Sequence, residues 1–309
     1  MSTLEPSETW RPPPPPARPD DGHKGTFGTV IVVGGSAAMP HAPAICARAA
    51  FRSGCGLVKL AAYADVLPAA LLTEPSATGI RLDSQDRRDG ELAALDAADP
   101  DQRAVLAVGP GLGGSPADGP GSGGGGGGDR HRIERLVVSL LHGHRPVVMD
   151  ADALNLLAAT GQRHAPTGPP CVLTPHPGEY RRLARAAGIE QDPIAAESRP
   201  AAAEQLARFH HAVVVLKGHR TVVSDGRRSY INPTGNPALA TAGTGDVLTG
   251  VIAALMAQGL EPFDAAGLGV ELHGAAGDAW AKRHGVSGLL ARELADELPG
   301  VFQCARQHG

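Results

Sequence analysis

Short apolar runs alternate with amphipathic segments along most of the chain. The apolar runs lie at Thr29–Val33, Leu57–Ala61, Arg103–Val108, Pro146–Met149, Cys171–Thr174 and Val213–Leu216. Apolar residues at helical spacing follow several of them, at Ala42–Ser53, Ile133–Leu141, Ala153–Ala159 and Gly178–Ala187. Strands that alternate with helices in this way indicate an α/β domain, with a mainly parallel sheet covered by helices on both faces.

The pattern changes after the sixth run. Two strand-like segments, Arg220–Ser224 and Arg228–Asn232, flank Asp225-Gly226, a dipeptide typical of tight β-hairpins. The remaining apolar spacing predicts helices over Thr244–Gln258, Pro262–Arg283 and Leu290–Leu298. No internal repeat is visible, so we expect a single domain over residues 21–309.

Two segments break the alternation. Residues 1–20 include five consecutive prolines, Pro12–Pro16, and predict an extended polyproline tail that is disordered or loosely docked. The glycines of Gly123–Gly128 belong to a second irregular segment, and we expect a glycine-rich loop insertion at about residues 113–129. Neither segment has the apolar residues that a core requires.

Composition and charge exclude several functional classes. Hydrophobic residues make up 42% of the chain, which is enough for a large core. The net charge of −4 and the 3% of aromatic residues argue against a nucleic-acid partner. No apolar stretch approaches the ~20 residues that cross a bilayer, and no signal sequence is recognisable, so we expect a cytoplasmic protein without a membrane partner. The four cysteines have no Cys-x-x-Cys spacing and are expected to be reduced packing thiols.

Polar and glycine-rich segments follow five of the predicted strands, and ligands of such sheets bind beyond the carboxyl ends of the strands. These segments are Gly34-Gly35-Ser36, Gly109–Gly113, Asp150-Ala151-Asp152, Pro175–Glu179 and Lys217-Gly218. The glycine runs lack the Gly-x-x-x-x-Gly-Lys-Ser/Thr pattern of a P-loop.

The strongest motif is Gly243-Thr244-Gly245-Asp246, which stands directly before an apolar helix. The free N–H groups at the start of that helix predict an anion hole for a phosphoryl group in transfer. We expect the helix dipole to favour the ionised form of Asp246. A plain helix cap is the alternative role for this aspartate.

Taken with the alternating sheet, Gly-Thr-Gly-Asp resembles the signature of the ribokinase-like superfamily, which implies a three-layer α/β/α domain. In that superfamily the aspartate is the base and the glycine N–H groups form the anion hole. Together with five further segments it resembles the ADP-dependent NAD(P)H-hydrate dehydratases over about residues 21–300. Those segments are Gly22–Gly28, Gly109–Gly113, Asp150–Asn155, Thr174–Glu179 and Val215–Thr221.

The resemblance implies ADP-dependent dehydration of the S epimer of NADH hydrate and NADPH hydrate. The products would be NADH or NADPH, AMP and phosphate, with ADP as co-substrate and Mg²⁺ as cofactor. No residue visibly excludes ATP. The resemblance also assigns roles to individual residues. The catalytic residues are Gly243, Thr244, Gly245 and Asp246, and the substrate-binding residues are Ala42, Gly111, Gly113, His176 and Asp246. The nucleotide is bound by Lys217, Gly218, His219, Arg220, Thr221 and Gly245, and Glu179 contacts the metal through water.

Some of these residues have simpler interpretations. Glu179 could be a surface carboxylate and Lys217 a solvated strand-end lysine. His176 stands where the wider superfamily has Asn, as in the dehydratases, and the insertion after Gly113 departs from the family pattern. Asp150 and Asn155 are candidates for orienting the site.

Two other functions stay open from the sequence. One is a small-alcohol kinase of the same superfamily, of the thiazole-alcohol type. The other is a catalytically idle nucleotide sensor. Residues 1–20 are too short to hold the epimerase domain of some relatives, so we expect any epimerase on a separate chain. A homo-oligomer is left open.

Overall fold

The predicted apolar runs form the central sheet of the protein in a computed structural model, which describes residues 10–82, 90–113 and 127–308 (the backbone alone for 127–129 and 308). Within these residues the sheet has nine strands in the order β3-β2-β1-β4-β5-β6-β7-β8-β9. The strands are β1 (Thr29–Val33), β2 (Leu57–Ala62), β3 (Thr78–Arg81), β4 (Val105–Val108), β5 (Val147–Met149), β6 (Cys171–Leu173), β7 (Val213–Leu216), β8 (Val222–Ser224) and β9 (Ser229–Ile231).

Strands β1 to β7 are parallel, whereas β8 and β9 form the predicted antiparallel hairpin at one edge. The first strand shows why both faces need a cover. Val30 and Val32 belong to the core on one face, and Ile31 and Val33 belong to the core on the other. Successive side chains of a strand point to opposite faces of the sheet. A run that is apolar at every position must therefore be covered on both faces.

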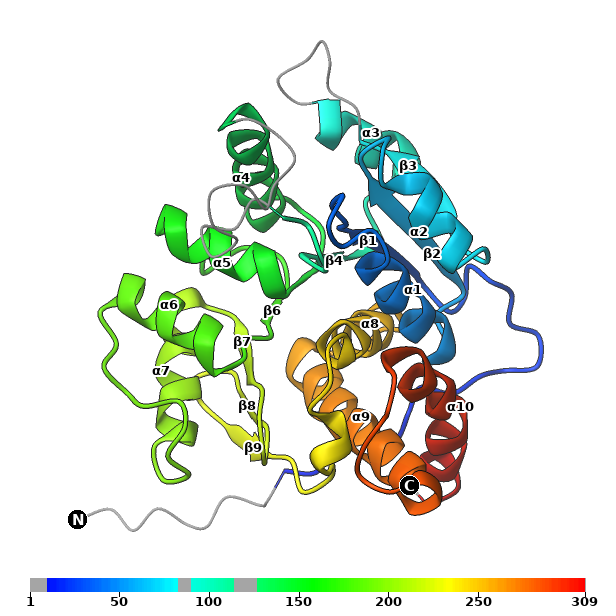
Figure 1. Cartoon of the computed structure of the whole chain (residues 1–309), viewed down its shortest axis with the longest axis vertical. Helices are drawn as coiled ribbons and strands as arrows, with labels where there is room; N and C mark the ends of the chain where they lie inside the picture. The colour runs from blue at the N-terminus through cyan, green and yellow to red at the C-terminus, as the bar shows by residue number, and fades with distance from the viewer. Residues whose placement is uncertain (1–9, 83–89, 114–126, 309) are drawn as a thin grey trace.

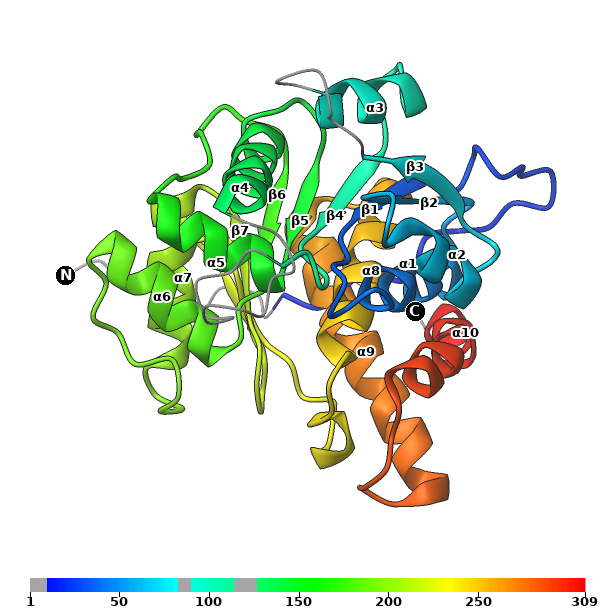
Figure 2. The same ribbon diagram turned by 45° about the horizontal axis from the view of Figure 1, so that its top comes forward.

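Helices cover both faces and give three layers (Figures 1 and 2). One face carries α1 (Ala42–Arg52), α2 (Leu67–Thr73), α8 (Thr244–Ala257), α9 (Pro262–His284) and α10 (Ala291–His308). The other carries α3 (Gly90–Ala98), α4 (Gly127–Leu141), α5 (Ala151–Thr160), α6 (Pro177–Ala187) and α7 (Arg199–His210). The predicted three-layer α/β/α architecture with a mainly parallel sheet is confirmed.

Several elements differ from the sequence-based prediction. The structure adds β3, α2, α3 and α7, which were not predicted. Helix α4 begins at Gly127, inside the predicted insertion, and α10 continues past Pro299 to His308. Residues 114–126, which hold most of the predicted glycine-rich insertion, lie outside the described residues. No helix of the described residues is both long enough and apolar enough to span a bilayer.

The N-terminal segment is docked on the body from Trp10 onward, while residues 1–9 lie outside the described residues. Pro15 is buried, and Arg18 Nη1 donates a 2.8 Å hydrogen bond to the carbonyl oxygen of Gly54. Of the two states predicted for this segment, the docked one therefore describes residues 10–20.

Candidate active site

The Gly-Thr-Gly-Asp turn opens α8 at the carboxyl edge of the sheet. Gly243 is the N-cap residue and has a left-handed φ of 88°, which a residue with a side chain rarely adopts. Thr244 Oγ1 donates to the carbonyl oxygens of Leu239 and Thr241, each at 2.9 Å. His273 on α9 lies 2.9 Å through Nε2 from the carbonyl oxygen of Thr244. The turn is thus fixed from both sides, with the free N–H groups of the helix exposed toward the site.

Asp246 lies in the first turn of α8 but is not its cap, because Gly243 takes that position without a side-chain capping bond. Burial raises the pKa of Asp246 to about 8, and the charge of Asp150 adds to this while Lys217 opposes it. The expectation that the helix dipole keeps this carboxylate ionised is therefore wrong, since burial and the neighbouring carboxylates outweigh the dipole. No hydrogen-bond donor of the described residues binds its carboxylate. A carboxyl group of this kind is suited to take up a proton.

Asp150 forms the centre of a buried polar cluster. Its Oδ1 accepts from Lys217 Nζ at 2.6 Å and from Thr174 Oγ1 at 2.8 Å, and its Oδ2 accepts from Thr249 Oγ1 at 2.9 Å. Burial works to raise the pKa of Asp150, but the ammonium of Lys217 holds it below the usual value. Lys217 is buried in this ion pair and is not a solvated strand-end lysine. An added Cβ at Gly245 would lie 3.4 Å from Lys217 Nζ, which places the ammonium beside the predicted anion hole.

His176 and Glu179 form a reciprocal cap at the start of α6. His176 Nδ1 accepts from the backbone N–H groups of Gly178 and Glu179, and Glu179 Oε2 accepts from the backbone N–H of His176 at 2.7 Å. Glu179 is only 4% exposed, so it is not a surface carboxylate. Burial raises its pKa to about 7, although Lys217, 3.7 Å away, opposes the rise. The motif Thr174–Glu179 therefore brings a half-exposed imidazole and a buried carboxyl group to the same edge as Asp246.

The donor groups of this edge can be tested against Mg²⁺. Among the described residues no three His, Cys, Asp or Glu side chains cluster as a ready ligand set. Both oxygens of Asp150 accept hydrogen bonds, and Glu179 accepts from the backbone N–H of His176 and lies 3.3 Å from His176 Nε2, so Asp246 is the carboxyl group here with no donor among the described residues. Such a sparse set fits Mg²⁺, which keeps several waters and is often held by substrate phosphates together with one or two carboxylates.

The six residues that the resemblance assigns to the nucleotide line one cavity of about 510 Å³. Lys217–Thr221 form one wall, and Gly245 lies at the base of α8. The opposite wall comes from the loop Asn232–Asn236 and from His273 and Gly274 of α9. Arg199, which sequence reasoning missed, supports the Lys217 turn, since its guanidinium donates to the carbonyl oxygens of Leu216 and Lys217.

Ala42 and Gly111 lie together at the start of α1, and Gly113 lies next to Ser36. A Cβ added to Gly111, whose φ is +60°, would stand 2.8 Å from the Cβ of Ala42, and the N–H of Gly113 donates to Asp152 Oδ2 at 2.8 Å. Ile45, one turn further along α1, lies beside Gly243. Ala42 and Gly111 thus lie at the start of the helix that also contacts the Gly243 turn.

Sequence reasoning missed several supporting residues. Thr249 binds Asp150, His273 fixes Thr244, and Arg182 donates to Asn155 Oδ1 at 2.7 Å. Asn155 is therefore buried and bonded rather than solvated. The one available signal was Thr249, a polar residue in an otherwise apolar helix, three positions after Asp246 and so on the same helical face.

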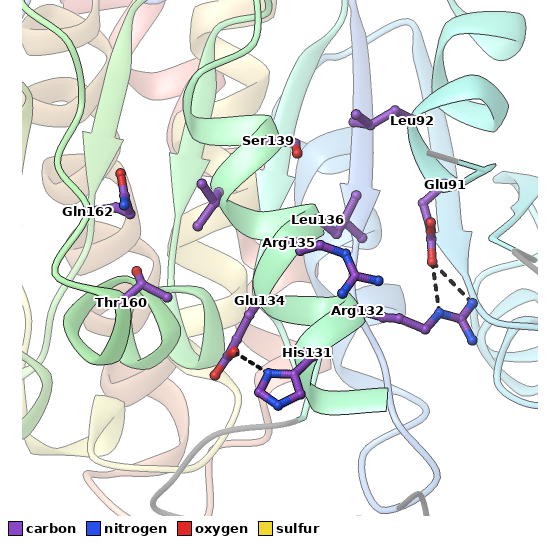
Figure 3. Close-up of a pocket in the computed structure, with 11 residues that line it drawn as sticks. Glu91, Leu92, His131, Arg132, Glu134, Arg135, Leu136, Ser139, Thr160 and Gln162 are labelled. Atoms are coloured by element: carbon purple, nitrogen blue, oxygen red, sulfur yellow. Dashed lines mark hydrogen bonds and ion pairs between the residues drawn. The ribbon is translucent and has the colours of Figure 1, made fainter. Parts of the chain in front are cut away.

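A second hollow lies between α3, α4 and α5, away from these residues. Figure 3 shows Arg132 facing Glu91, and His131 facing Glu134, along its rim. None of the predicted site residues lines this groove. Its two carboxylates, Glu91 and Glu134, are each paired with a basic side chain.

A mainly parallel α/β/α sheet with a Gly-Thr-Gly-Asp helix and a nucleotide-sized cavity at its carboxyl edge defines a ribokinase-like protein. Comparison with known proteins narrows the class further. The model that describes NAD(P)H-hydrate dehydratases matches residues 30–300. The chain belongs to the NAD(P)H-hydrate dehydratase family.

Individual relatives agree with this assignment. The chain is 41% identical over 288 residues to the ADP-dependent (S)-NAD(P)H-hydrate dehydratase of Neisseria meningitidis serogroup B, covering 90% of this chain and 86% of the relative. It is 34% identical to the enzyme of the same name from Bacillus subtilis, covering 93% and 94%. A crystal structure of the Bacillus subtilis ADP/ATP-dependent NAD(P)H-hydrate dehydratase, co-crystallised with ATP and Mg²⁺, superposes with a TM-score of 0.72 at 31% identity, covering 94% of both chains.

Some relatives are longer. The chain is 41% identical to the bifunctional NAD(P)H-hydrate repair enzyme of Moorella thermoacetica and spans 52% of its length. It therefore corresponds to about half of such bifunctional relatives.

Proposed function

We propose that this protein dehydrates the S epimer of NADH hydrate and NADPH hydrate at the expense of ADP, releasing NADH or NADPH, AMP and phosphate. One observation carries the proposal. Thr244 and Gly245 at the start of α8 line the cavity that holds every predicted nucleotide residue, while Gly243 lies beside Ile45 of α1, the helix that also carries Ala42 next to Gly111. A phosphoryl donor on one side and an acceptor on the other would meet at the anion hole.

Phosphorylation solves the central difficulty of the reaction, because hydroxide is a poor leaving group. Asp246 takes the proton of the substrate hydroxyl group while that oxygen attacks the terminal phosphorus of ADP. The bond from this phosphorus to the AMP oxygen breaks, and AMP leaves. The lone pair of the ring nitrogen then expels phosphate by breaking its carbon–oxygen bond. Loss of a proton from the neighbouring ring carbon restores the dihydronicotinamide.

The surrounding residues would stabilise the transferred charge. The N–H groups at Gly243–Gly245 face the equatorial oxygens of the phosphoryl group, and Lys217 stands beside Gly245 as a fixed cation. Mg²⁺, when bound, supplies further positive charge to the phosphates, and Glu179 would contact it through water. A pKa of about 8 leaves Asp246 close to the operating pH, which favours reversible proton uptake.

The remaining expectations keep their status as proposals. These are the use of ADP as co-substrate, with ATP also possible, and a cytoplasmic location. The two other functions considered, a small-alcohol kinase and an idle nucleotide sensor, are not favoured, since the relatives that match most of the chain are named as dehydratases.

The experiment is to incubate the protein with S-NADH hydrate, Mg²⁺ and either ADP or ATP, and to follow the return of dihydronicotinamide absorbance. We expect recovery that requires the nucleotide and that yields one AMP per NADH when ADP is used. Phosphorylation of thiazole alcohols with the hydrate left untouched would replace the proposal with the kinase.

A further inference from the structure

Residues 10–20, here called the strap, belong to a segment that the sequence analysis singled out and that the proposed function does not use. In Figure 1 the dark blue trace runs from the end of the β8–β9 hairpin past α9 and α10 toward β1. The strap therefore runs along the helical layer that contains α9 and α10. Its contacts show which elements of the fold it joins.

Trp10 is seated between α9 and β9. Its ring stands edge-to-face against Tyr230, with centroids 5.0 Å apart, and against Phe263 at 4.8 Å. Its Nε1 donates to Asp264 Oδ1 at 3.2 Å. The ring also fills the space above Gly267, where an added Cβ would come within 2.2 Å of Trp10 Cη2. Aromatic edge-to-face pairs and a satisfied indole N–H are typical of a specific anchor.

The rest of the strap is tied down at its far end. The carbonyl oxygen of Pro16 accepts from Arg306 Nε on α10 at 3.4 Å. The guanidinium of Arg18 lies over the ring of Phe27 at 3.8 Å and donates to Gly54. Prolines between these anchors restrict the backbone, so little chain entropy remains to be lost when Trp10 docks.

A short chain of contacts joins Trp10 to the cavity. The hydroxyl of Tyr230 donates to Glu271 Oε2, and the carbonyl oxygen of Glu271 accepts from Thr234 Oγ1 at 2.8 Å. Thr234 lies in the cavity wall Asn232–Asn236. Gly274, on the same wall, approaches so closely that an added Cβ would lie 2.1 Å from Thr234 Oγ1. The wall is thus bonded to α9, and β9 is tied through Tyr230 to the same residue of α9, Glu271.

We propose that Trp10 is a positioning residue for the nucleotide: by clamping β9 onto α9 it holds the wall Asn232–Asn236 in its binding geometry. The inference rests on the proposed use of this cavity for ADP. Trp10 does not itself line the cavity, so it acts through Tyr230, Glu271 and Thr234. Because coupling between two sites is reciprocal, bound ADP in turn tightens the docking of Trp10.

Two variants remove the clamp from opposite sides. Trp10→Ala deletes the anchor. Gly267→Ala leaves the strap unchanged but adds a methyl group on α9 in the space that the Trp10 ring occupies. In each we expect the KM for ADP and the Kd of Mg²⁺–ADP to rise about tenfold, within the usual range of coupling between sites. The kcat and the KM for the hydrate should stay within twofold of the wild type. The double variant should add nothing further, because both changes break the same contact.

Matched controls separate positioning from general stability. Gly300→Ala makes the same change in α10, where an added Cβ meets no atom within 4 Å, and Arg11→Ala changes an exposed side chain of the strap. Both should leave the KM for ADP unchanged. Trp10→Phe should restore most of the affinity, because the aromatic contacts survive. An unchanged KM for ADP in Trp10→Ala and Gly267→Ala, whatever their melting temperatures, would overturn the proposal.

Docking can be measured without nucleotide. The sequence has two tryptophans, so Trp280→Phe leaves Trp10 as the sole emitter. Acrylamide should quench the fluorescence of Trp10 less than that of free tryptophan, and less again when Mg²⁺–ADP is bound. Quenching like that of free tryptophan would overturn the docking itself. Failure of the wild-type protein to bind ADP would instead refute the proposed function and the nucleotide role of the strap, while leaving the docking result intact.

Discussion

Asp150 and Asp246 both feel the charge of Lys217, but they differ in their hydrogen bonds and in the direction in which their pKa is shifted. Asp150 has each carboxylate oxygen bonded, to Lys217, Thr174 and Thr249, and its pKa is held low. Asp246 has no such donors among the described residues, and burial raises its pKa to about 8. A bonded carboxylate positions its neighbours, whereas an unbonded one of high pKa can take up a proton. From this difference we expect Asp150 to support the structure and Asp246 to take part in the chemistry.

The largest effect should come from Asp246→Asn. A positioned general base is typically worth ~10²–10⁴ in rate, so kcat should fall at least a hundredfold. Affinity for Mg²⁺–ADP should persist, since the turn and Lys217 are intact. Steady-state kinetics and calorimetry on one preparation test this, with Asp225→Asn in the β8–β9 hairpin as a control. Near-normal turnover would remove Asp246 from the mechanism.

Asp150→Asn should act first on stability. It leaves the buried ammonium of Lys217 without its counter-charge, and breaking a buried ion pair typically costs about 3–5 kcal/mol of unfolding free energy. Urea unfolding gives the value. Glu204→Gln, which breaks the exposed pair with Arg208, should cost less than about 1 kcal/mol. Equal losses in the two variants would show that the buried pair has no special role.

Thr249→Val should have a smaller effect of the same kind. It removes one hydrogen bond to a charged carboxylate, with an expected loss of about 1–3 kcal/mol, and Thr249→Ser should recover most of it. Turnover should change only a few-fold, because the ion pair with Lys217 still holds Asp150. A loss of turnover as large as that of Asp246→Asn would contradict the division between the two aspartates.

A further effect concerns the pH dependence of stability. A carboxyl group whose pKa is raised from its ordinary 3.8 to about 8 binds its proton more tightly in the folded state, so the wild type loses stability as the pH rises through this window. Asp246→Asn lacks this loss. The melting temperature of the variant should match that of the wild type near pH 4 and exceed it increasingly up to pH 8. If the melting temperature of the variant exceeds that of the wild type by the same amount at every pH, the difference does not come from the titration of Asp246.

The sequence predicted the central strands and the anion hole because their signals are local. The run Thr29–Val33 is apolar at every position after the first, as double burial requires, and Gly243–Asp246 is contiguous. Strand β3 was missed because three of its four residues are exposed at the sheet edge, so no apolar run marks it. Helix α2 is short and was missed for lack of a repeated pattern.

The polar cluster could not be predicted from sequence in the same way. Asp150 and Lys217 are separated by 67 positions, and Asp150 and Thr249 by 99, so only the fold brings them together. The expected ionisation of Asp246 failed for the same reason. The dipole is a local property, but the burial and the three carboxylates that raise the pKa come from distant segments. The individual site roles assigned by resemblance remain predictions.

The strap also has a consequence for the order in which the chain is made. Trp10 finds its partner Asp264 254 positions later, and Pro16 finds Arg306 after 290. At ribosomal rates of about 5–20 residues per second, the strap waits on the order of tens of seconds for its seat to be synthesised. For the last seconds of that wait, once Thr234 has been made and before Asp264 follows, the cavity wall near Thr234 has no support from Trp10. Affinity for the nucleotide would thus mature only after α9 and α10 have left the ribosome, which postpones ligand capture by nascent chains.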